Sequence, residues 1–277
     1  MHIVGSNLKI TASPSAWFDA LGSQYWDDLG YYGGHEKPMF AMIEVKYSTL
    51  IGLKVRNTPA HAFMIACSEH STFQNFKVDD SAGDLTPGRK AKNTDGIHIL
   101  QSTAITVVGA EIINQDDCVC ITSGFDVNIT AITCLGGGLS VGSVGKNTNA
   151  NEVTKVIFSQ STITNSLYGV LVKTWVGGHG LVDQVTFEDI SLKDIRMYGV
   201  AISQGYTNEG ITAAPTDGVP ITNLILRNVI GNVSPGAQRV LVRCGSSKSC
   251  LRFFWTVVKF SGGEPSKGNL NVPDGAR

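Results

Sequence analysis

The chain has 277 residues, of which 42% are hydrophobic and only 16% are charged, with a formal net charge of −1 and 31 glycines. A near-neutral charge leaves no basic surface for nucleic acid and no broad field that attracts a polyanion. The longest apolar stretches, such as "FFWTVV" at residues 253–258, are far too short to cross a bilayer. We therefore expect a single globular domain over residues 1–277, without nucleic acid or a membrane as a partner.

A unit of similar pattern repeats along the chain. Each copy has a short apolar run, a turn rich in Gly, Asn, Asp or Ser, and a second apolar run that ends in a polar residue. The copies start about 20 to 35 residues apart, a period typical of stacked solenoid coils. In chain order they occupy residues 47–59, 70–81, 102–115, 125–136, 151–166, 182–195 and 220–232.

Alternation of apolar and polar residues within each unit, as at Val156 and Phe158, predicts short strands with one buried face. No convincing helix of about ten residues appears. One coil cannot bury its own apolar face, so neighbouring coils stack and share a core. An antiparallel sandwich would need tight two-residue hairpins such as Asn-Gly, which the chain lacks. The sequence therefore predicts an all-β fold, a right-handed parallel β-helix, with surface loops at 33–38 and 207–220.

Acidic residues mark a candidate site. Asp95 and Asp116 are separated by about one coil, so we expect comparable places in successive layers, with carboxylates close enough to couple their titrations. Asp117 joins them only where the backbone turns. Carboxyl groups with unequal pKa values are what glycoside hydrolysis requires. Two alternatives stay open: turns in which Asp caps backbone amides, and a calcium site formed with Asn93.

Six cysteines permit 15 pairings, among which the sequence alone does not choose. Cys244 and Cys250 bracket a short polar loop that a disulfide could close, and Cys118 lies 16 residues before Cys134. The chain has no CxxC pair and no nearby histidine pair that would favour zinc. We interpret the remaining cysteines as buried thiols; these are Cys67 and Cys120.

Five segments occur in an order and at spacings that resemble one enzyme family. They are "NTDGIHI", "NQDDCVCITSG", "GGGLSVGSVG", "GVLVKTW" and "ISQGY". Together they resemble the active-site motifs of the polygalacturonases of glycoside hydrolase family 28, nearest to the fungal endo-acting type, over about residues 4 to 273. The resemblance implies a right-handed parallel β-helix, inverting hydrolysis of α-1,4 bonds in polygalacturonan, and neither a metal nor an organic cofactor.

The resemblance also implies a role for each matching residue. Asp116 would be the general acid, while Asp95 and Asp117 would hold and activate the attacking water. Lys173 would bind a galacturonate carboxylate, and Tyr206 would contact the substrate. Asn93 would orient the first acid through hydrogen bonds. The resemblance also implies two disulfides, which join Cys118 to Cys134 and Cys244 to Cys250.

Two positions depart from the family pattern. Where the family has Gly-His-Gly-Leu-Ser, this chain has glycines before Leu-Ser, and we assign the lost histidine to Gly138. Where the family has Arg-Ile-Lys, Leu171 replaces the arginine. Loss of these groups predicts weak hydrolysis or none. We expect His98 and His179 to be surface residues that do not replace the lost imidazole, because strand alternation places His98 on the face opposite Asp95 and His179 lies past a strand end.

Three hypotheses follow for the function. The first is an impaired polygalacturonase, the second is a pseudoenzyme that binds oligogalacturonate without cutting it, and the third is a calcium-dependent pectate lyase. The lyase would need an arginine base near the acids, a place taken by Leu171. The resemblance further implies an extracellular monomer, although the chain begins without a recognisable signal peptide and at the equivalent of an inner coil, without the usual N-terminal cap.

Overall fold

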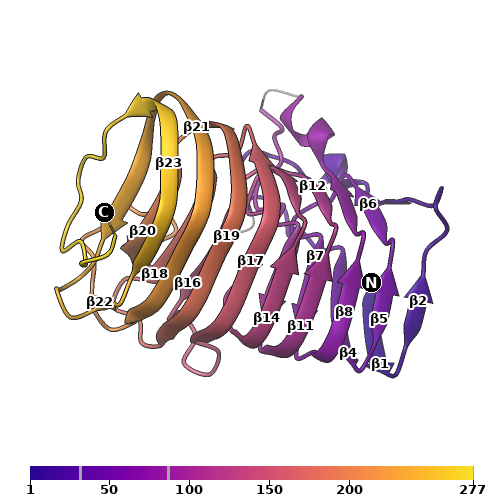
Figure 1. Cartoon of the computed structure of the whole chain (residues 1–277). Helices are drawn as coiled ribbons and strands as arrows, with labels where there is room; N and C mark the ends of the chain where they lie inside the picture. Colours follow the sequence, from indigo (N-terminus) through magenta and orange to yellow (C-terminus); the bar gives the residue numbers. More distant parts are fainter. Residues whose placement is uncertain (31–32, 86–87, 277) are drawn as a thin grey trace.

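The computed structural model describes residues 1–30, 33–85 and 88–276, which form a right-handed parallel β-helix (Figure 1). The described residues contain 23 strands in continuous parallel ladders. The helices described are two short 3₁₀ turns, η1 (Gly22–Gln24) and η2 (Ser81–Asp84). In this part of the chain, no helix has the length and apolar character of a bilayer-spanning segment. The predicted fold is therefore confirmed, and the predicted loops at 33–38 and 207–220 contain no strand.

The strands stack into three parallel ladders that run the length of the solenoid. We call the ladder that carries the candidate site the site sheet. In stacking order it contains β1 (His2–Ser6), β4 (Ala41–Lys46), β7 (Phe63–Ala66), β10 (Ile97–Leu100), β13 (Val119–Ile121), β16 (Leu139–Val144), β18 (Tyr168–Trp175), β20 (Tyr198–Tyr206) and the end of β21 (Ile221–Arg243).

The other two ladders complete the wall of each coil. The second contains β2 (Lys9–Thr11), β5 (Thr49–Ile51), β8 (Glu69–Gln74), β11 (Ser102–Val108), β14 (Gly124–Thr130), β17 (Glu152–Thr164), β19 (Leu181–Ile195), β21 and β23 (Phe254–Glu264), with β22 (Cys250–Leu251) paired to the start of β21. The third contains β3 (Phe18–Asp19), β6 (Lys54–Arg56), β9 (Lys77–Asp79), β12 (Glu111–Ile113) and β15 (Thr133–Leu135), and then continues into the later halves of β17 and β19.

One corner of the solenoid is built from a single left-handed residue in each coil. A residue in the left-handed region of φ/ψ space changes the direction of the chain within one residue. The strand therefore bends at this residue, while its hydrogen bonds to the neighbouring coils continue. Such bends leave strands as long as β21, at 23 residues, unbroken around the coil. The stacked residues at this corner are Asn7, Tyr47, His70, Ala104, Asp126, Lys155, Gln184, Asn223 and Arg252.

The interior is a continuous apolar stack. The burial pattern of β17 alternates between buried and exposed positions, as the sequence predicts for a strand with one face in the core. Phe158 and Phe187, in neighbouring layers, stack with ring centroids 4.7 Å apart and nearly parallel planes. Identical side chains in register thus fill the space between coils, which fixes the layer register for the whole solenoid.

Both implied disulfides are present, joining Cys118 to Cys134 and Cys244 to Cys250. Cys120 is buried, as expected. The prediction for Cys67 is wrong, because this thiol is exposed. Cys67 has a left-handed backbone and follows the last residue of β7, so it lies at a coil corner rather than on the inward face of a strand.

Asp80 is a fully buried carboxyl group that joins two coils. Its two oxygens accept hydrogen bonds from the backbone N–H and the hydroxyl of Thr58, both at 2.6 Å. Burial raises the pKa of Asp80 to about 7, although these hydrogen bonds favour the ionised form. The folded state therefore binds a proton that the unfolded chain has already lost above the ordinary pKa of 3.8.

We expect Asp80 to make the protein less stable as the pH rises from about 4 to about 7. In Asp80→Asn, which keeps a neutral group of the same shape, this contribution to the pH dependence should disappear. Urea unfolding of both proteins across this range measures the difference. An identical pH dependence in the two proteins would show that Asp80 does not carry a raised pKa.

Candidate active site

Two columns of side chains cross the site sheet from layer to layer, about 4.8 Å apart. The turn column lies two residues before the paired positions Phe63, Ile97, Val119, Leu139 and Val170. Its members are His61, Asp95, Asp117, Gly137 and Tyr168. The strand column points outward from the sheet itself, and its members are Met64, His98, Cys120, Ser140, Leu171 and Ala201.

The register corrects one expectation about the acids. Asp95 lies level with Asp117, not with Asp116, because Ile97 pairs with Val119 and the N–H of Gly96 donates to the carbonyl of Asp117 at 3.0 Å. Carboxylate oxygens of Asp95 and Asp117 lie within 4.8 Å of each other. Asp116 belongs to the turn that precedes this layer, where the chain changes direction, so all three acids still gather in one place.

Asp116 lines the cleft that covers the site sheet. It is half-buried; its Oδ2 accepts from the Asn93 amide at 3.0 Å and its Oδ1 from the N–H of Asp117 at 2.8 Å. Burial, together with the charges of Asp95 and Asp117, raises the pKa of Asp116 to about 8. Asp116 therefore carries a proton at neutral pH. The predicted contact of Asn93 with an acid is present, and the acid concerned is Asp116.

Asp117 forms a buried ion pair with Lys173. Its Oδ2 accepts from Lys173 Nζ at 2.8 Å, and its Oδ1 accepts from the Ser140 hydroxyl at 2.6 Å. Burial opposes the charged form of Lys173, yet Asp117, Tyr206 and Asp116 raise its pKa well above the ordinary value. Burial raises the pKa of Asp117, and the Lys173 ammonium offsets part of that shift. Lys173 is thus a permanent cation held beside two acids.

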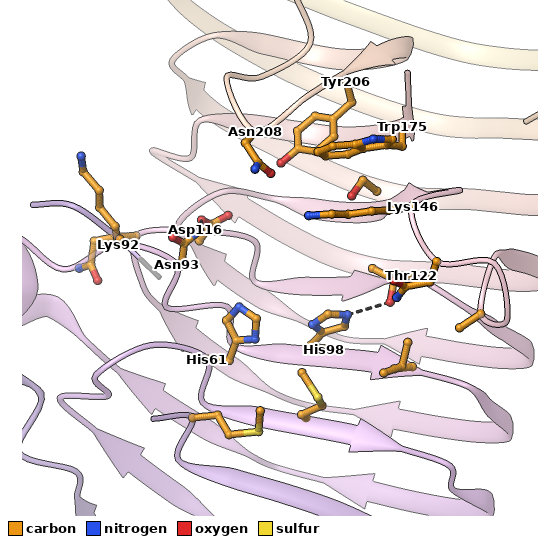
Figure 2. A pocket seen from close by; sticks show the side chains of 18 of the residues that line it. His61, Lys92, Asn93, His98, Asp116, Thr122, Lys146, Trp175, Tyr206 and Asn208 are labelled. Carbon is orange, nitrogen blue, oxygen red and sulfur yellow. Dashed lines mark hydrogen bonds between the residues drawn. The ribbon is translucent and has the colours of Figure 1, made fainter. Parts of the chain in front are cut away.

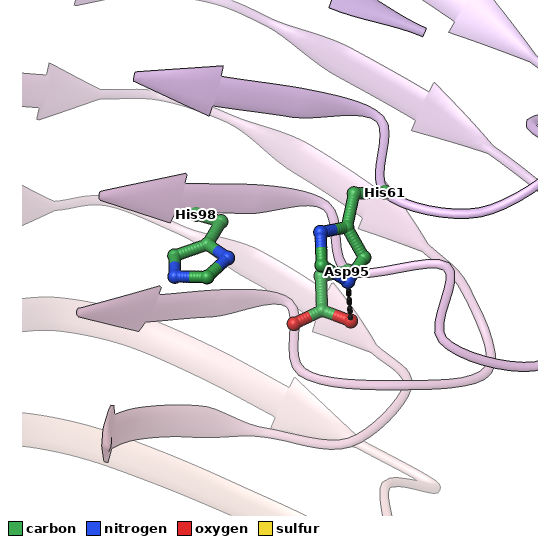
Figure 3. A group of neighbouring side chains, drawn as sticks. All are labelled: His61, Asp95 and His98. Atoms are coloured by element: carbon green, nitrogen blue, oxygen red, sulfur yellow. Dashed lines mark ion pairs between the residues drawn. The ribbon is translucent and has the colours of Figure 1, made fainter. Parts of the chain in front are cut away.

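Asp95 lies against two imidazoles (Figure 3). His61 Nε2 is 3.5 Å from Asp95 Oδ1, and the His61 and His98 ring centroids are 5.5 Å apart. Burial opposes ionisation of Asp95, but His61, His98 and Lys173 outweigh it and hold its pKa below the ordinary value. Burial lowers the pKa of His98 to about 4, against the pull of Asp95. Asp95 is therefore an ionised carboxylate.

The expectation that His98 is a surface residue on the face opposite Asp95 is wrong. Strand alternation does not reach Asp95, because β10 begins at Ile97 and Asp95 lies in the preceding turn. His98 is half-buried in the strand column and points into the same cleft. His179 is exposed, as expected.

A cleft of about 800 Å³ covers the site sheet and continues into a smaller recess of about 260 Å³. Asp116 and Tyr206 line both parts and stand at their boundary. The larger part also contains His61, His98, Lys92, Lys146 and Trp175 (Figure 2). The smaller part contains Lys173, Leu171, Tyr168 and Ile211. A chain lying along the cleft would therefore cross Asp116 at its middle.

Tyr206 contacts the charged centre of the site. Its ring lies 5.0 Å from Lys173 Nζ and 5.6 Å, edge to face, from the ring of Trp175. Lys146 lies 4.6 Å from the Trp175 ring centroid. An aromatic pair beside cations suits a ligand with apolar faces and negative groups. Trp175 and Lys146 were not identified from the sequence, because Trp175 is the last residue of β18 and Lys146 follows β16 in a loop, where no periodicity reveals which side chains reach the cleft.

The assignment of the lost histidine to Gly138 is wrong by one residue, and neither Gly137 nor Gly138 has room for a side chain. Gly138 has φ +109°, and a Cβ atom there would lie 2.2 Å from the carbonyl oxygen of Tyr168. Counting back from the shared Leu139 and Ser140 gives Gly137, which directly follows Asp117 in the turn column. A Cβ atom at Gly137 would lie 2.7 Å from Asp117 N, so the turn at Asp116 closes over this glycine.

Leu171 lies in an apolar cluster on the outer face of the sheet. It is 1% exposed and packs with Ala201, Ile211 and Leu241. Ile211 comes from the 207–220 loop, so the loop folds back over the strand column. The wall of the smaller recess is therefore apolar at the position where the family pattern has arginine.

The geometry does not favour the calcium alternative. Among the described residues, two groups bring three metal-ligating types together, and neither contains Asp116. Asp117 already accepts from Ser140 and Lys173, and an ammonium among the acids repels a second cation. Asp116 is likewise occupied by the Asn93 amide and a backbone N–H.

Removal of the Lys173 charge should destabilise the fold, because Asp117 would then be a buried carboxylate without its cationic partner. Lys173→Met should lower the free energy of unfolding by about 3–5 kcal/mol, because a buried carboxylate loses its partner. Lys46→Met is the matched control, since Lys46 forms an exposed pair with Glu69 at 2.7 Å and should matter little. Urea denaturation measures both. Equal effects of the two substitutions would contradict a buried ion pair.

The sequence and the fold are similar to those of known polygalacturonases. The chain is 42% identical over 278 residues to a polygalacturonase from Cochliobolus carbonum, and the match covers 100% of this chain and 75% of that protein. It is 41% identical to endopolygalacturonase I from Aspergillus aculeatus, in a match that covers 100% of this chain and 72% of that protein. The structure of endopolygalacturonase I from Stereum purpureum, complexed with two galacturonate, superposes with a TM-score of 0.78 at 25% identity, over 97% of this chain and 88% of the other. The family pattern named glycosyl hydrolases family 28 matches residues 1–277, and the chain belongs to this family.

Proposed function

We propose that the protein hydrolyses α-1,4-galacturonosidic bonds in polygalacturonan with inversion at the anomeric carbon. The observation that carries this proposal is the unequal protonation of neighbouring acids in one cleft. Asp116, with a pKa near 8, is a proton donor at neutral pH, while Asp95 is ionised beside it. The polygalacturonases among its relatives, at about 40% identity, support the same substrate.

In this mechanism each acid has a separate task. Asp116 donates its proton to the glycosidic oxygen as the bond to the anomeric carbon breaks. A water molecule attacks that carbon from the opposite face and gives its proton to Asp95. Asp117, held by Ser140 and Lys173, accepts a hydrogen bond from the same water and fixes its position. Solvent then returns the proton from Asp95 to Asp116.

The remaining cleft residues would bind the chain on either side of this bond. Lys173 would attract a galacturonate carboxylate from its place beside Asp117, and Tyr206 would pack on the sugar. Asn93 holds Asp116 in position through its amide. The family's arginine has no counterpart at Leu171, and no imidazole stands at Gly137 or Gly138. Substrate binding and turnover would therefore be weaker than the cleft shape alone suggests.

The alternative is a pseudoenzyme that binds oligogalacturonate without cutting it. The observation that favours it is the apolar environment of Leu171, which leaves an anionic sugar with fewer cations in the smaller recess. Either function would place the protein outside the cell as a monomer, and two disulfides suit an oxidising compartment.

The pH profile tests the role of Asp116. Release of reducing ends from polygalacturonic acid should persist up to about pH 8 and then fall about tenfold per pH unit in kcat/KM, because Asp116 loses its proton. Asp116→Asn should lower kcat by about 10²-fold to 10⁴-fold. Asp126→Asn, a change at an exposed corner residue, is the control and should alter neither.

Three outcomes separate the hypotheses. Release that Asp116→Asn abolishes supports the hydrolase. Calorimetric binding of oligogalacturonate without any release in the unaltered protein supports the pseudoenzyme. Release that requires added calcium and yields an unsaturated product would contradict both and favour a lyase.

The substitution Leu171→Arg tests whether the missing arginine is the cause of weak substrate binding. An arginine that reaches the smaller recess can donate two hydrogen bonds to a galacturonate carboxylate, so KM should fall about tenfold or more. Leu171→Met keeps the volume without the charge and should leave KM unchanged. An unchanged KM in Leu171→Arg, with the protein still folded by circular dichroism, would show that Leu171 does not face the substrate.

A further inference from the structure

His61 and His98 line the larger part of the cleft and form a cluster with Asp95. The proposed hydrolysis uses the Asp95 carboxylate but gives neither histidine a task. Ligating atoms of His61, Asp95 and His98 all lie within 4.8 Å of one another. His61 Nε2 and Asp95 Oδ1 are already 3.5 Å apart. Two ligands bonded to one tetrahedral zinc ion at about 2.0–2.2 Å are separated by about 3.3–3.5 Å. The first pair therefore has the separation of shared ligands, and the third donor is within a small side-chain movement.

The orientation of His98 suits a ligand. Its Nε2 lies 2.8 Å from the hydroxyl of Thr122, whereas its Nδ1 is buried and has no hydrogen-bond partner. Figure 3 shows this second nitrogen on the side of the ring that faces Asp95 and His61. A ligating histidine is commonly held through its other nitrogen in this way. A buried ring nitrogen without a partner is costly, and a bound ion would satisfy it.

The donor types select the class of ion. Two imidazole nitrogens and one carboxylate oxygen suit zinc and similar transition ions, whereas calcium and magnesium prefer oxygen alone. His61 and His98 line the cleft of about 800 Å³, so an ion can enter and keep a water molecule on its open side. The Lys173 ammonium repels a cation, but its ion pair with Asp117 offsets that charge.

We propose that His61, Asp95 and His98 form a binding site for a divalent transition ion of the zinc class. Occupation of this site ties up the Asp95 carboxylate, which then cannot accept a proton from the attacking water. The ion is thus an inhibitor that competes with the chemistry. This consequence rests on the proposed hydrolysis, whereas the binding itself does not.

Isothermal titration with zinc chloride at pH 7 tests the site directly. We expect one zinc ion per chain, with affinity at least about 100-fold weaker in His98→Gln and in His61→Gln, and about 10-fold to 100-fold weaker in Thr122→Val, which removes only the hydroxyl at His98 Nε2. His70→Gln, an exposed histidine at a coil corner, is the matched control and should bind zinc as the unaltered protein does. Calcium chloride should give no comparable heat.

Zinc binding that is absent, or equal in His98→Gln and the control, would overturn the proposal, since the three residues would then form only an ion pair. Where reducing-end release is measurable, zinc should suppress it and excess chelator should restore it. Release that zinc leaves unaffected while calorimetry shows the site filled would overturn the inhibitory consequence. A protein without any hydrolysis would still report the site through calorimetry, so the two proposals fail separately.

Discussion

The parallel register of the site sheet is the constraint on which the site depends. Because Phe63, Ile97, Val119 and Leu139 pair in successive layers, residues tens of positions apart become neighbours about 4.8 Å from each other. The apolar interior fixes this register, since a slip of one residue would turn every core side chain outward. The chemistry of the site is therefore set by a column that runs across the coils, not by any single motif.

Burial within that column forces unlike protonation states. Asp95, Asp116 and Asp117 cannot all ionise in a site with little water, and their pKa values differ because their neighbours differ. Asp95 lies beside two imidazoles and Asp117 beside an ammonium, whereas Asp116 accepts from two neutral N–H donors and is next to the charges of the other two acids. Asp116, with a pKa of about 8, keeps its proton at neutral pH, and it lines both parts of the cleft.

The sequence predicted the fold well because stacking leaves a direct signal, namely alternation within strands and a repeat between coils. It also predicted that Asp95, Asp116 and Asp117 lie close together, because each of these acids is part of a short, continuous sequence motif. It failed for His98, because alternation was extended across a turn that strand periodicity does not describe. It had no means to find His61, which precedes Asp95 by 34 residues and reaches it only through the layer pairing of β7 with β10. Coil lengths vary, so an exact layer partner cannot be counted from the sequence.

The imidazoles around the acids lie on one side of the site. The turn column has His61 in the layer before Asp95, and a glycine, Gly137, in the layer after Asp117. The strand column repeats part of this asymmetry, with His98 in the layer of Asp95 and Leu171 two layers after Asp117. The Lys173 ammonium, in contrast, reaches Asp117 from β18 on the C-terminal side. Imidazoles on one side and this ammonium on the other together hold the pKa of Asp95 low, while Leu171 leaves the wall of the smaller recess apolar.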